Sequence, residues 1–184
     1  MYVNYLKFID NNKLITTSND CNFKINDLIN KKVIQKYKND SPINHCDLNN
    51  DKNILLCIGD SKYITVVDLR NNKKICNLGE HYDYGIAIKF NPNNDNYLAS
   101  GNKDYGCKIW DMRKLDSSVL TSWGNFDSIG DLDWIDENKL CYMENSFLIH
   151  IFDIKNNRIQ DLPYVGSGNG IVHDKLSNNI YLIN

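Results

Sequence analysis

The middle of the chain holds three residues of the types that form a nucleophilic triad, namely His81, Ser100 and Asp104. In such a triad the histidine takes the proton of the serine, and the aspartate orients the histidine. Many hydrolases expose the serine on a G-x-S-x-G turn, and this sequence contains no such turn. The three residue types alone therefore do not indicate a hydrolase, and their role depends on the elements that position them.

Other motifs for catalysis or metal binding are absent from the sequence. It has no H-E-x-x-H motif, no phosphate-binding Walker loop and no cysteine-rich zinc pattern. His45, Cys46 and Asp47 are adjacent, but neighbours on a strand point to opposite faces, so the three cannot converge on one site. The glycine-rich stretch 166–170 lacks the spacing of a dinucleotide or phosphate loop. We expect no metal, no cofactor and no catalytic residue.

The composition favours a single folded domain with a buried core. The chain has 184 residues, of which 42% are hydrophobic and 24% are charged. Its net charge of -2 argues against nucleic acid as the partner, although a local basic patch stays open. The six cysteines are scattered singly, and the chain starts with no signal-peptide pattern and has no apolar run near the roughly 18 residues of a membrane helix. These features predict reduced thiols in the cytoplasm or nucleus, and no membrane partner.

The sequence contains a repeat. Four segments of 14 residues each start with leucine, end with aspartate and align without a gap, and their closing aspartates lie 41, 43 and 42 residues apart. The segments are 14–27, 55–68, 98–111 and 140–153. A period of roughly 40–45 residues is that of a four-stranded propeller blade. Each unit also has a short run before the leucine and another after the aspartate, as expected of four strands in meander order.

These repeats resemble those of the WD-repeat family over nearly the whole chain. Trp110-Asp111 matches the family's signature dipeptide, and "GEH" at 79–81 looks like the Gly-His element that opens a repeat. The third unit is near the consensus, whereas the others have degenerate dipeptides. Within the family, 81–115 and 147–172 are most similar to a little-characterised fungal and plant group, in which the second stretch lies near the C-terminus. The chain would then cover the C-terminal portion of such proteins.

The resemblance implies an all-β propeller formed by one WD-repeat region, 1–184. We expect about four four-stranded antiparallel blades and a partial fifth, in a ring that usually closes with about seven blades. The predicted units span about 1–40, 41–79, 80–123, 124–166 and, for the partial unit, 167–184. The chain is interpreted as part of a larger propeller or as an incomplete gene product.

The resemblance also gives the triad residues a structural role. Trp110 would pack between neighbouring blades, and its indole N–H would need a partner there. In the family, a serine on the second strand accepts this hydrogen bond, backed by a histidine from the preceding loop and an aspartate of the tight turn. Ser100, His81 and Asp104 occupy those places. Because Ser100 would be buried against Trp110, we interpret the set as a structural staple and not as a catalytic relay.

One rim of the propeller carries the best candidates for binding a partner. Propellers bind through rim loops, and tyrosine and tryptophan are favoured anchors at interfaces. The candidate residues are Tyr82, Tyr84, Lys103, Tyr105 and Trp123. An alternative, which the sequence leaves open, is that some of these rings pack between blades.

Two arginines suggest a sharper function. Arg70 and Arg113 each follow the closing aspartate of a unit by two residues, in consecutive units. This pair resembles the motif by which substrate receptors of cullin–RING ubiquitin ligases contact their adaptor. The alternative is that the two arginines are solvated or pair with carboxylates of their own blades.

The sequence therefore predicts a non-catalytic scaffold that binds other proteins through its rims. A cullin-ligase receptor is the sharper alternative. An enzyme with a site in the central channel and a nucleic-acid-binding propeller are alternatives of other classes, and charge and composition favour neither.

Overall fold

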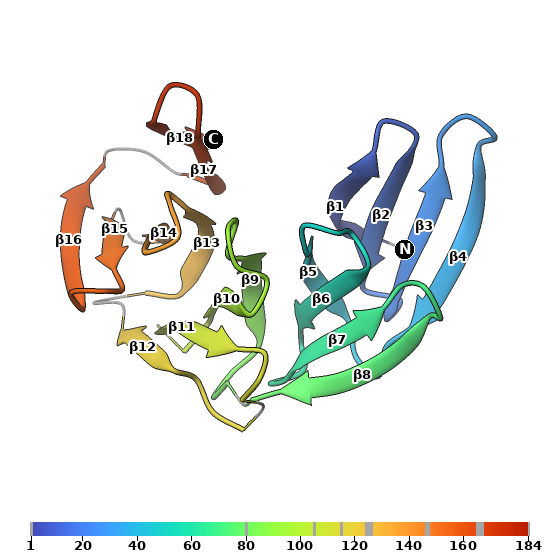
Figure 1. Cartoon of the computed structure of the whole chain (residues 1–184), viewed down its shortest axis with the longest axis horizontal. Coiled ribbons are helices and arrows are strands. Elements are labelled where there is room, and N and C mark those ends of the chain that lie inside the picture. Colours follow the sequence, from blue (N-terminus) through green and yellow to red (C-terminus); the bar gives the residue numbers. More distant parts are fainter. Residues whose placement is uncertain are drawn as a thin grey trace.

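The computed structural model describes residues 2–79, 81–104, 106–114, 116–123, 127–145, 148–164 and 168–183, with only the backbone of Trp123. These residues form five antiparallel sheets, four with four strands and one with two. Within each sheet the strands follow one another as a meander, and the sheets stand side by side in an open arc around a hollow (Figure 1). The predicted all-β propeller architecture, with four blades and a partial fifth, is confirmed.

The first two sheets come from the N-terminal half of the chain. The first contains β1 (Val3–Asp10), β2 (Lys13–Ser18), β3 (Asn22–Asp27) and β4 (Lys32–Lys38). The second contains β5 (Ile43–Leu48), β6 (Ile54–Gly59), β7 (Ile64–Asp68) and β8 (Lys73–Leu78). The strand next to the hollow is the first of each sheet, and β1, β5 and β9 (Gly85–Phe90) lie against one another in sequence.

The remaining sheets continue the arc. The third contains β9, β10 (Tyr97–Asn102), β11 (Gly106–Asp111) and β12 (Leu120–Trp123). The fourth contains β13 (Ile129–Trp134), β14 (Lys139–Glu144), β15 (Leu148–Asp153) and β16 (Arg158–Pro163). The last contains β17 (Gly170–Asp174) and β18 (Asn179–Ile183), and β17 lies against β13.

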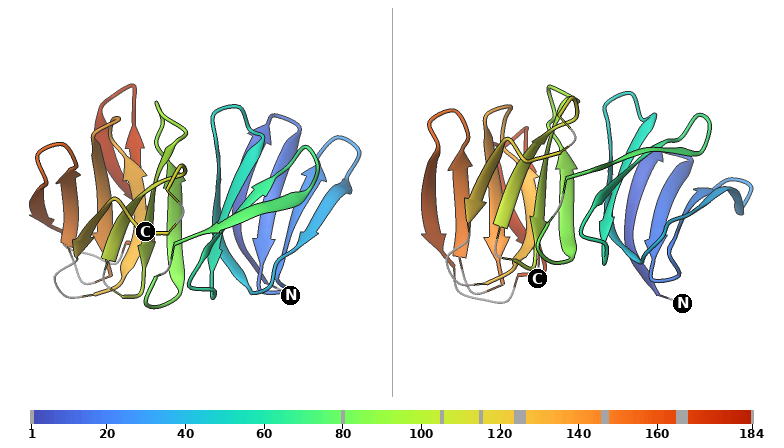
Figure 2. Two further views of the ribbon diagram at one scale, coloured as in Figure 1. Left: turned by 60° about the horizontal axis from the view of Figure 1, so that its bottom comes forward. Right: turned by 90° about the horizontal axis from the view of Figure 1, so that it is seen from below.

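The meander sorts the connections onto two rims. Strands run between the rims, as Figure 2 shows, so connections alternate from one rim to the other along the chain. We call the rim that holds Tyr82 and Tyr84 the Tyr rim; it carries the loops between sheets and the middle turn of each sheet, such as β10–β11. We call the rim that holds Arg70 and Arg113 the Arg rim; it carries the first and last turns, such as β9–β10 and β11–β12.

The core lies between sheets. Ile15, Phe23 and Leu55 pack between the first and second sheets, and the cluster around Ile64 and Trp110 fills the space between the second and third. Because the second and third sheets are covered on both faces, their middle strands β7 and β10 are buried along nearly their whole length instead of on alternate residues.

The repeated aspartates have a local role. In each of the four full sheets the aspartate that closes the third strand accepts a hydrogen bond of 2.9 Å from a backbone N–H two or three residues later. This Asx-type bond stabilises the turn to the fourth strand. The repeat of aspartate at Asp27, Asp68, Asp111 and Asp153 is therefore explained by the turn, independently of any ligand.

Candidate interaction site

The indole of Trp110 is the centre of the best-formed staple. Trp110 is 1% exposed and packs with Leu78 and Ile88 between the second and third sheets. Gly79 lies over the ring with a φ of +44°, and a Cβ at this position would overlap the ring. Only glycine combines this backbone conformation with the missing side chain, which explains why a glycine opens the third repeat.

A chain of hydrogen bonds holds the Trp110 ring. The indole Nε1–H donates to Ser100 Oγ at 2.7 Å, and His81 Nε2 lies 2.8 Å from the same oxygen. On the other side of the imidazole, the Asn102 amide donates to His81 Nδ1, while Asn102 Oδ1 accepts the Gly106 N–H. The Gly106 bond fixes the amide orientation, so Nδ1 is the acceptor and Nε2 carries the proton.

The aspartate of the predicted staple acts on the backbone instead of on the histidine ring. Asp104 accepts hydrogen bonds from the Tyr82 N–H at 2.9 Å and the Gly106 N–H at 3.2 Å. Asn102 takes the place beside the His81 ring, a role that the family pattern did not assign to it. Asp104 therefore ties the loop before β9 to the β10–β11 turn.

Burial keeps the staple neutral. Burial, with a smaller contribution from the Lys108 charge, lowers the pKa of His81 to about 3. Ser100 is completely buried and already accepts the indole hydrogen bond. A substrate cannot reach this hydroxyl, so the geometry supports a structural role for His81, Ser100 and Trp110.

The staple supports an exposed aromatic patch on the Tyr rim. Tyr82, which follows the staple histidine directly, is 72% exposed, and the Lys108 ammonium lies 4.9 Å from its ring centroid. Tyr84 is half-buried, and Lys103 Nζ lies 5.1 Å from its ring centroid. These are cation–π geometries, which orient both rings without covering them. Tyr105 and the side chain of Trp123 lie outside the described residues.

The two arginines of the Arg rim have matching local geometry. Arg70 pairs with Asp68 through Nε at 3.0 Å and Nη2 at 2.8 Å, and Arg113 pairs with Asp111 at 2.8 and 2.7 Å. Arg113 also lies over the Tyr97 ring. Hydrogen bonds from the Arg113 side chain lower the pKa of Asp111 to about 2. Both arginine side chains stay more than half exposed, so each guanidinium is oriented but accessible.

The other histidines lie in separate places. His45 packs against Tyr5 with ring centroids 3.7 Å apart, and burial lowers its pKa well below the usual value. His150 lies between Asp161, 2.7 Å from Nδ1, and Glu144, 3.1 Å from Nε2. Among the described residues, no three His, Cys, Asp or Glu side chains are grouped to hold a metal ion. In the same part of the chain, no helix is long and apolar enough to span a membrane.

A ring of charged residues on the inner strands was missed by the sequence analysis. Lys7, Asp47, Lys89 and Asp133 each come directly before a large apolar residue near the end of an inner strand. Asp47 lies 2.6 Å from Lys7 and accepts the Phe90 N–H at 2.8 Å from the next sheet. The alternation of lysine and aspartate at this one position of the repeat is the signal that could have revealed the ring.

Comparisons with known proteins agree with this architecture. Residues 72–111 match the family model "WD domain, G-beta repeat". Radiation-sensitive protein 28 of Saccharomyces cerevisiae is 28% identical over 153 residues, which cover 77% of this chain and 30% of that protein. Histone-binding protein MSI1 of the same yeast is 27% identical over 127 residues, covering 66% of this chain and 30% of MSI1. The chain thus spans less than a third of the length of either relative.

A solved structure gives the same result for the fold. The structure titled "Structure of U3-55K" superposes with a TM-score of 0.84, at 16% sequence identity, over 92% of this chain and 54% of that one. At this identity the likeness concerns the fold. The match of residues 72–111 and the stapled Trp110-Asp111 repeat show a WD repeat in this chain, and the solved structure shows that the chain has the β-propeller fold.

Proposed function

We propose that this chain is a non-catalytic scaffold that binds a protein partner through the Tyr rim. The observation that carries the proposal is the exposed Tyr82 beside Tyr84, because hydrogen bonds tie the backbones of both residues to the β10–β11 turn. The Tyr82 backbone is fixed by Asp104, and its neighbour His81 is buried. An exposed aromatic anchor on a fixed backbone loses little conformational entropy on binding, which favours affinity.

The cation beside each ring indicates the chemistry of the partner surface. Lys103 lies over Tyr84 and is exposed, so this part of the rim presents a positive charge, which favours an acidic partner surface. One relative is named a histone-binding protein, which supports protein binding as the class of function. We also propose a cytoplasmic or nuclear location, where the six free cysteines would stay reduced.

The test compares three forms of the tagged chain by affinity purification and quantitative mass spectrometry. The native chain is compared with the double variant Tyr82→Ala/Tyr84→Ala and with Ile29→Ala, which removes an exposed apolar side chain from the Arg rim. We expect a discrete set of proteins with the native chain and with Ile29→Ala, and at least a tenfold loss of that set with the double variant. Equal recovery by all three forms would show that the Tyr rim does not bind the partner.

Adaptor binding by a cullin–RING ligase receptor is a second candidate. It is favoured by Arg70 and Arg113, which have the same pairing geometry on neighbouring sheets and stay exposed. The matching test is co-purification of a cullin-ligase adaptor with the native chain and with Arg70→Ala/Arg113→Ala. Loss of the adaptor with the double variant would support the receptor function, and absence of the adaptor from the native purification would exclude it.

A further inference from the structure

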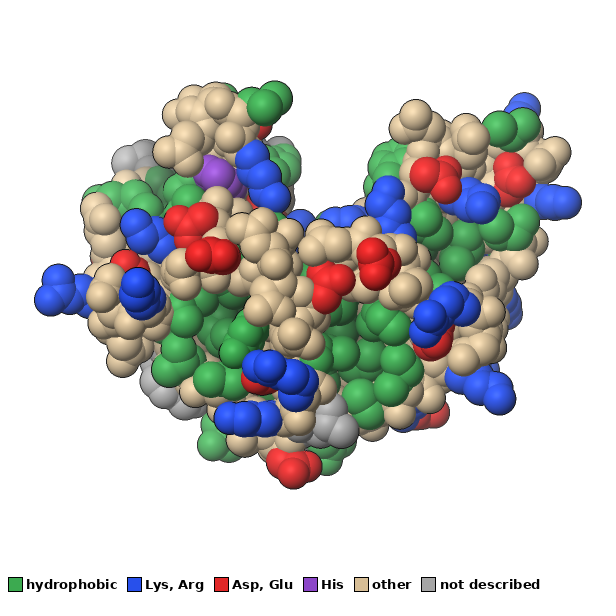
Figure 3. Space-filling model, viewed as in Figure 1, with side chains coloured by type: hydrophobic (Ala, Val, Ile, Leu, Met, Phe, Trp, Pro, Cys, Tyr) green, Lys and Arg blue, Asp and Glu red, His purple; other side chains and the backbone are tan. Residues whose placement is uncertain are grey.

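The inner mouth of the Arg rim contains a polar cavity that the Tyr-rim proposal does not use. Its volume is about 190 Å³, and it opens where β1, β5, β9, β13 and β17 approach one another. The charged side chains that line it are Lys7, Asp47, Lys89, Asp133 and Lys175, together with His173. Figure 3 shows Lys or Arg side chains along the edge of the hollow in the arc.

The two aspartates of this cavity are already occupied by donors. Asp47 accepts the Phe90 N–H at 2.8 Å and lies 2.6 Å from Lys7. Asp133 accepts the His173 N–H at 3.0 Å and the Trp134 N–H at 3.0 Å. The Trp134 bond lies within β13, whereas the other three contacts join neighbouring sheets. The two carboxylates therefore hold the sheets together and fix the cavity wall.

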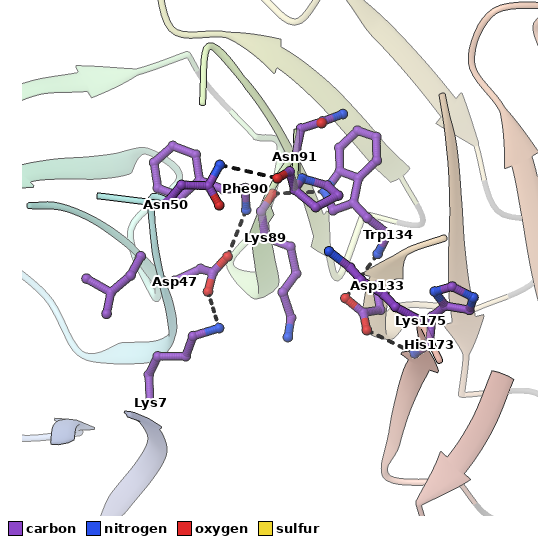
Figure 4. Close-up of a pocket in the computed structure, with 12 residues that line it drawn as sticks. Lys7, Asp47, Asn50, Lys89, Phe90, Asn91, Asp133, Trp134, His173 and Lys175 are labelled. Atoms are coloured by element: carbon purple, nitrogen blue, oxygen red, sulfur yellow. Dashed lines mark hydrogen bonds and ion pairs between the residues drawn. The ribbon is translucent and has the colours of Figure 1, made fainter. Parts of the chain in front are cut away.

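Two lysines that line the cavity, Lys89 and Lys175, differ from the aspartates in their contacts. The Lys89 side chain extends between the Asp47 and Asp133 carboxylates, as Figure 4 shows, and Lys175 approaches from the β17–β18 turn. Within the described ranges, no ion pair joins either ammonium to a carboxylate. Asp131 also faces the charge of Lys89, but it accepts the Leu132 and Ile171 N–H groups and does not line the cavity.

The charges of the wall select a monoanion. Three lysines and two aspartates leave one excess positive charge among the lysines and carboxylates of the wall. A carboxylate can accept hydrogen bonds from two ammonium groups at once. A phosphate dianion would bring a second negative charge next to Asp47 and Asp133, which repel it.

A second cavity on the Arg rim is lined mainly by apolar side chains and would accept an apolar group of the same ligand. It has a volume of about 280 Å³ and shares Asn91 and Trp134 with the first as a common wall. Val119, Leu120 and other mainly apolar side chains line it. Two adjacent cavities, one cationic and one apolar, match two neighbouring side chains of a single peptide segment.

We propose that the Arg rim binds a peptide segment in which an aspartate or glutamate is followed closely by an apolar residue. The carboxylate lies between Lys89 and Lys175, and the apolar side chain occupies the cavity beyond Trp134. The partner is therefore an acidic-apolar segment of a protein. This site is independent of the Tyr rim, so either proposal can fail without the other.

The test follows each lysine separately by NMR, after reductive ¹³C-methylation of the purified chain. The probe peptides are Ser-Gly-Glu-Leu-Gly-Ser, its Gln-Leu analogue and its Glu-Ser analogue, each titrated at constant ionic strength. We expect saturable shifts of the Lys89 and Lys175 signals with the Glu-Leu peptide and at least fivefold weaker binding of the other two peptides. Inorganic phosphate serves as the competing anion.

Variants complete the design. Lys175→Gln changes an exposed side chain, and Lys89→Gln removes the charge between the two aspartates. Each variant is expected to bind the Glu-Leu peptide about fivefold more weakly than the native chain does. Lys36→Gln, on the outer strand of the first sheet, is the matched control and should leave affinity unchanged. Unsaturable shifts spread over all lysines, unchanged affinity in both test variants, or tighter binding of phosphate than of the peptide would overturn the assignment.

Discussion

Truncation of Trp110 to alanine is expected to lower the free energy of unfolding by about 3–5 kcal/mol. The side chain is 1% exposed and lies in the cluster between the second and third sheets, so its removal leaves a cavity that two sheets would have to close. The variant also removes the indole N–H that donates to Ser100, a bond worth about 1 kcal/mol net.

The two contributions can be separated. Trp110→Phe keeps most of the apolar contact but has no N–H, so we expect a loss of about 1–2 kcal/mol. Ser100→Ala leaves the indole N–H buried without its partner, and a double-mutant cycle with Trp110→Phe should give a coupling energy of about 1 kcal/mol. Urea unfolding followed by far-ultraviolet circular dichroism measures each value without relying on tryptophan fluorescence.

A matched control comes from the first sheet. Phe8 is an aromatic residue near the end of β1, in the sheet at one end of the arc (Figure 1), and it is 56% exposed. Phe8→Ala should cost less than about 1 kcal/mol. If Trp110→Ala also costs less than about 1 kcal/mol, or if the cycle shows no coupling, the indole is not the staple of the second and third sheets.

Further predictions concern the same network. Gly79→Ala should cost about 2–4 kcal/mol in urea unfolding, because a Cβ would meet the Trp110 ring and the residue has a positive φ; a neutral result would refute the close packing. His81 has a folded pKa of about 3 against an unfolded value near about 6.5, so below that value the unfolded state gains a proton that the folded state does not. Its contribution to stability is therefore complete above about pH 6.5 and falls by up to about 1.4 kcal/mol per pH unit on acidification, and His81→Gln should remove this part of the slope; an unchanged slope would mean that His81 is accessible to protons. Arg113→Ala should raise the pKa of Asp111 from about 2 toward its ordinary value, measured by NMR titration of the carboxyl carbon, and should change stability by less than about 1 kcal/mol; an unchanged pKa would show that the pair does not form in solution.

The repeat made the blade architecture predictable. The equal spacing of the four closing aspartates reflects one turn geometry used in every full sheet, and periodic sequence therefore reports periodic structure directly. The partners of Trp110 were also predictable where the family pattern applied, as at Ser100 and His81.

The remaining contacts depend on distances between blades, which a repeat does not encode. Asn102 is one of many asparagines, and only the fold places its amide against the His81 ring. Lys89 and Lys175 are about two repeats apart in the chain, and their convergence requires the inner strands of several sheets to surround one hollow. Phe8 reads as a core residue by its place in the repeat, yet its burial depends on a neighbouring sheet.

Hydrogen–deuterium exchange of the chain, alone and with a partner purified through it, tests the Tyr rim most directly as the binding surface. The rim is expected to gain protection on binding at residues 81–84 and at the β10–β11 turn, while the outer strands β4 and β8 keep their free-state exchange. Protection confined to the outer strands, or no change at 81–84, would contradict the proposal that this WD-repeat chain binds through Tyr82 and Tyr84.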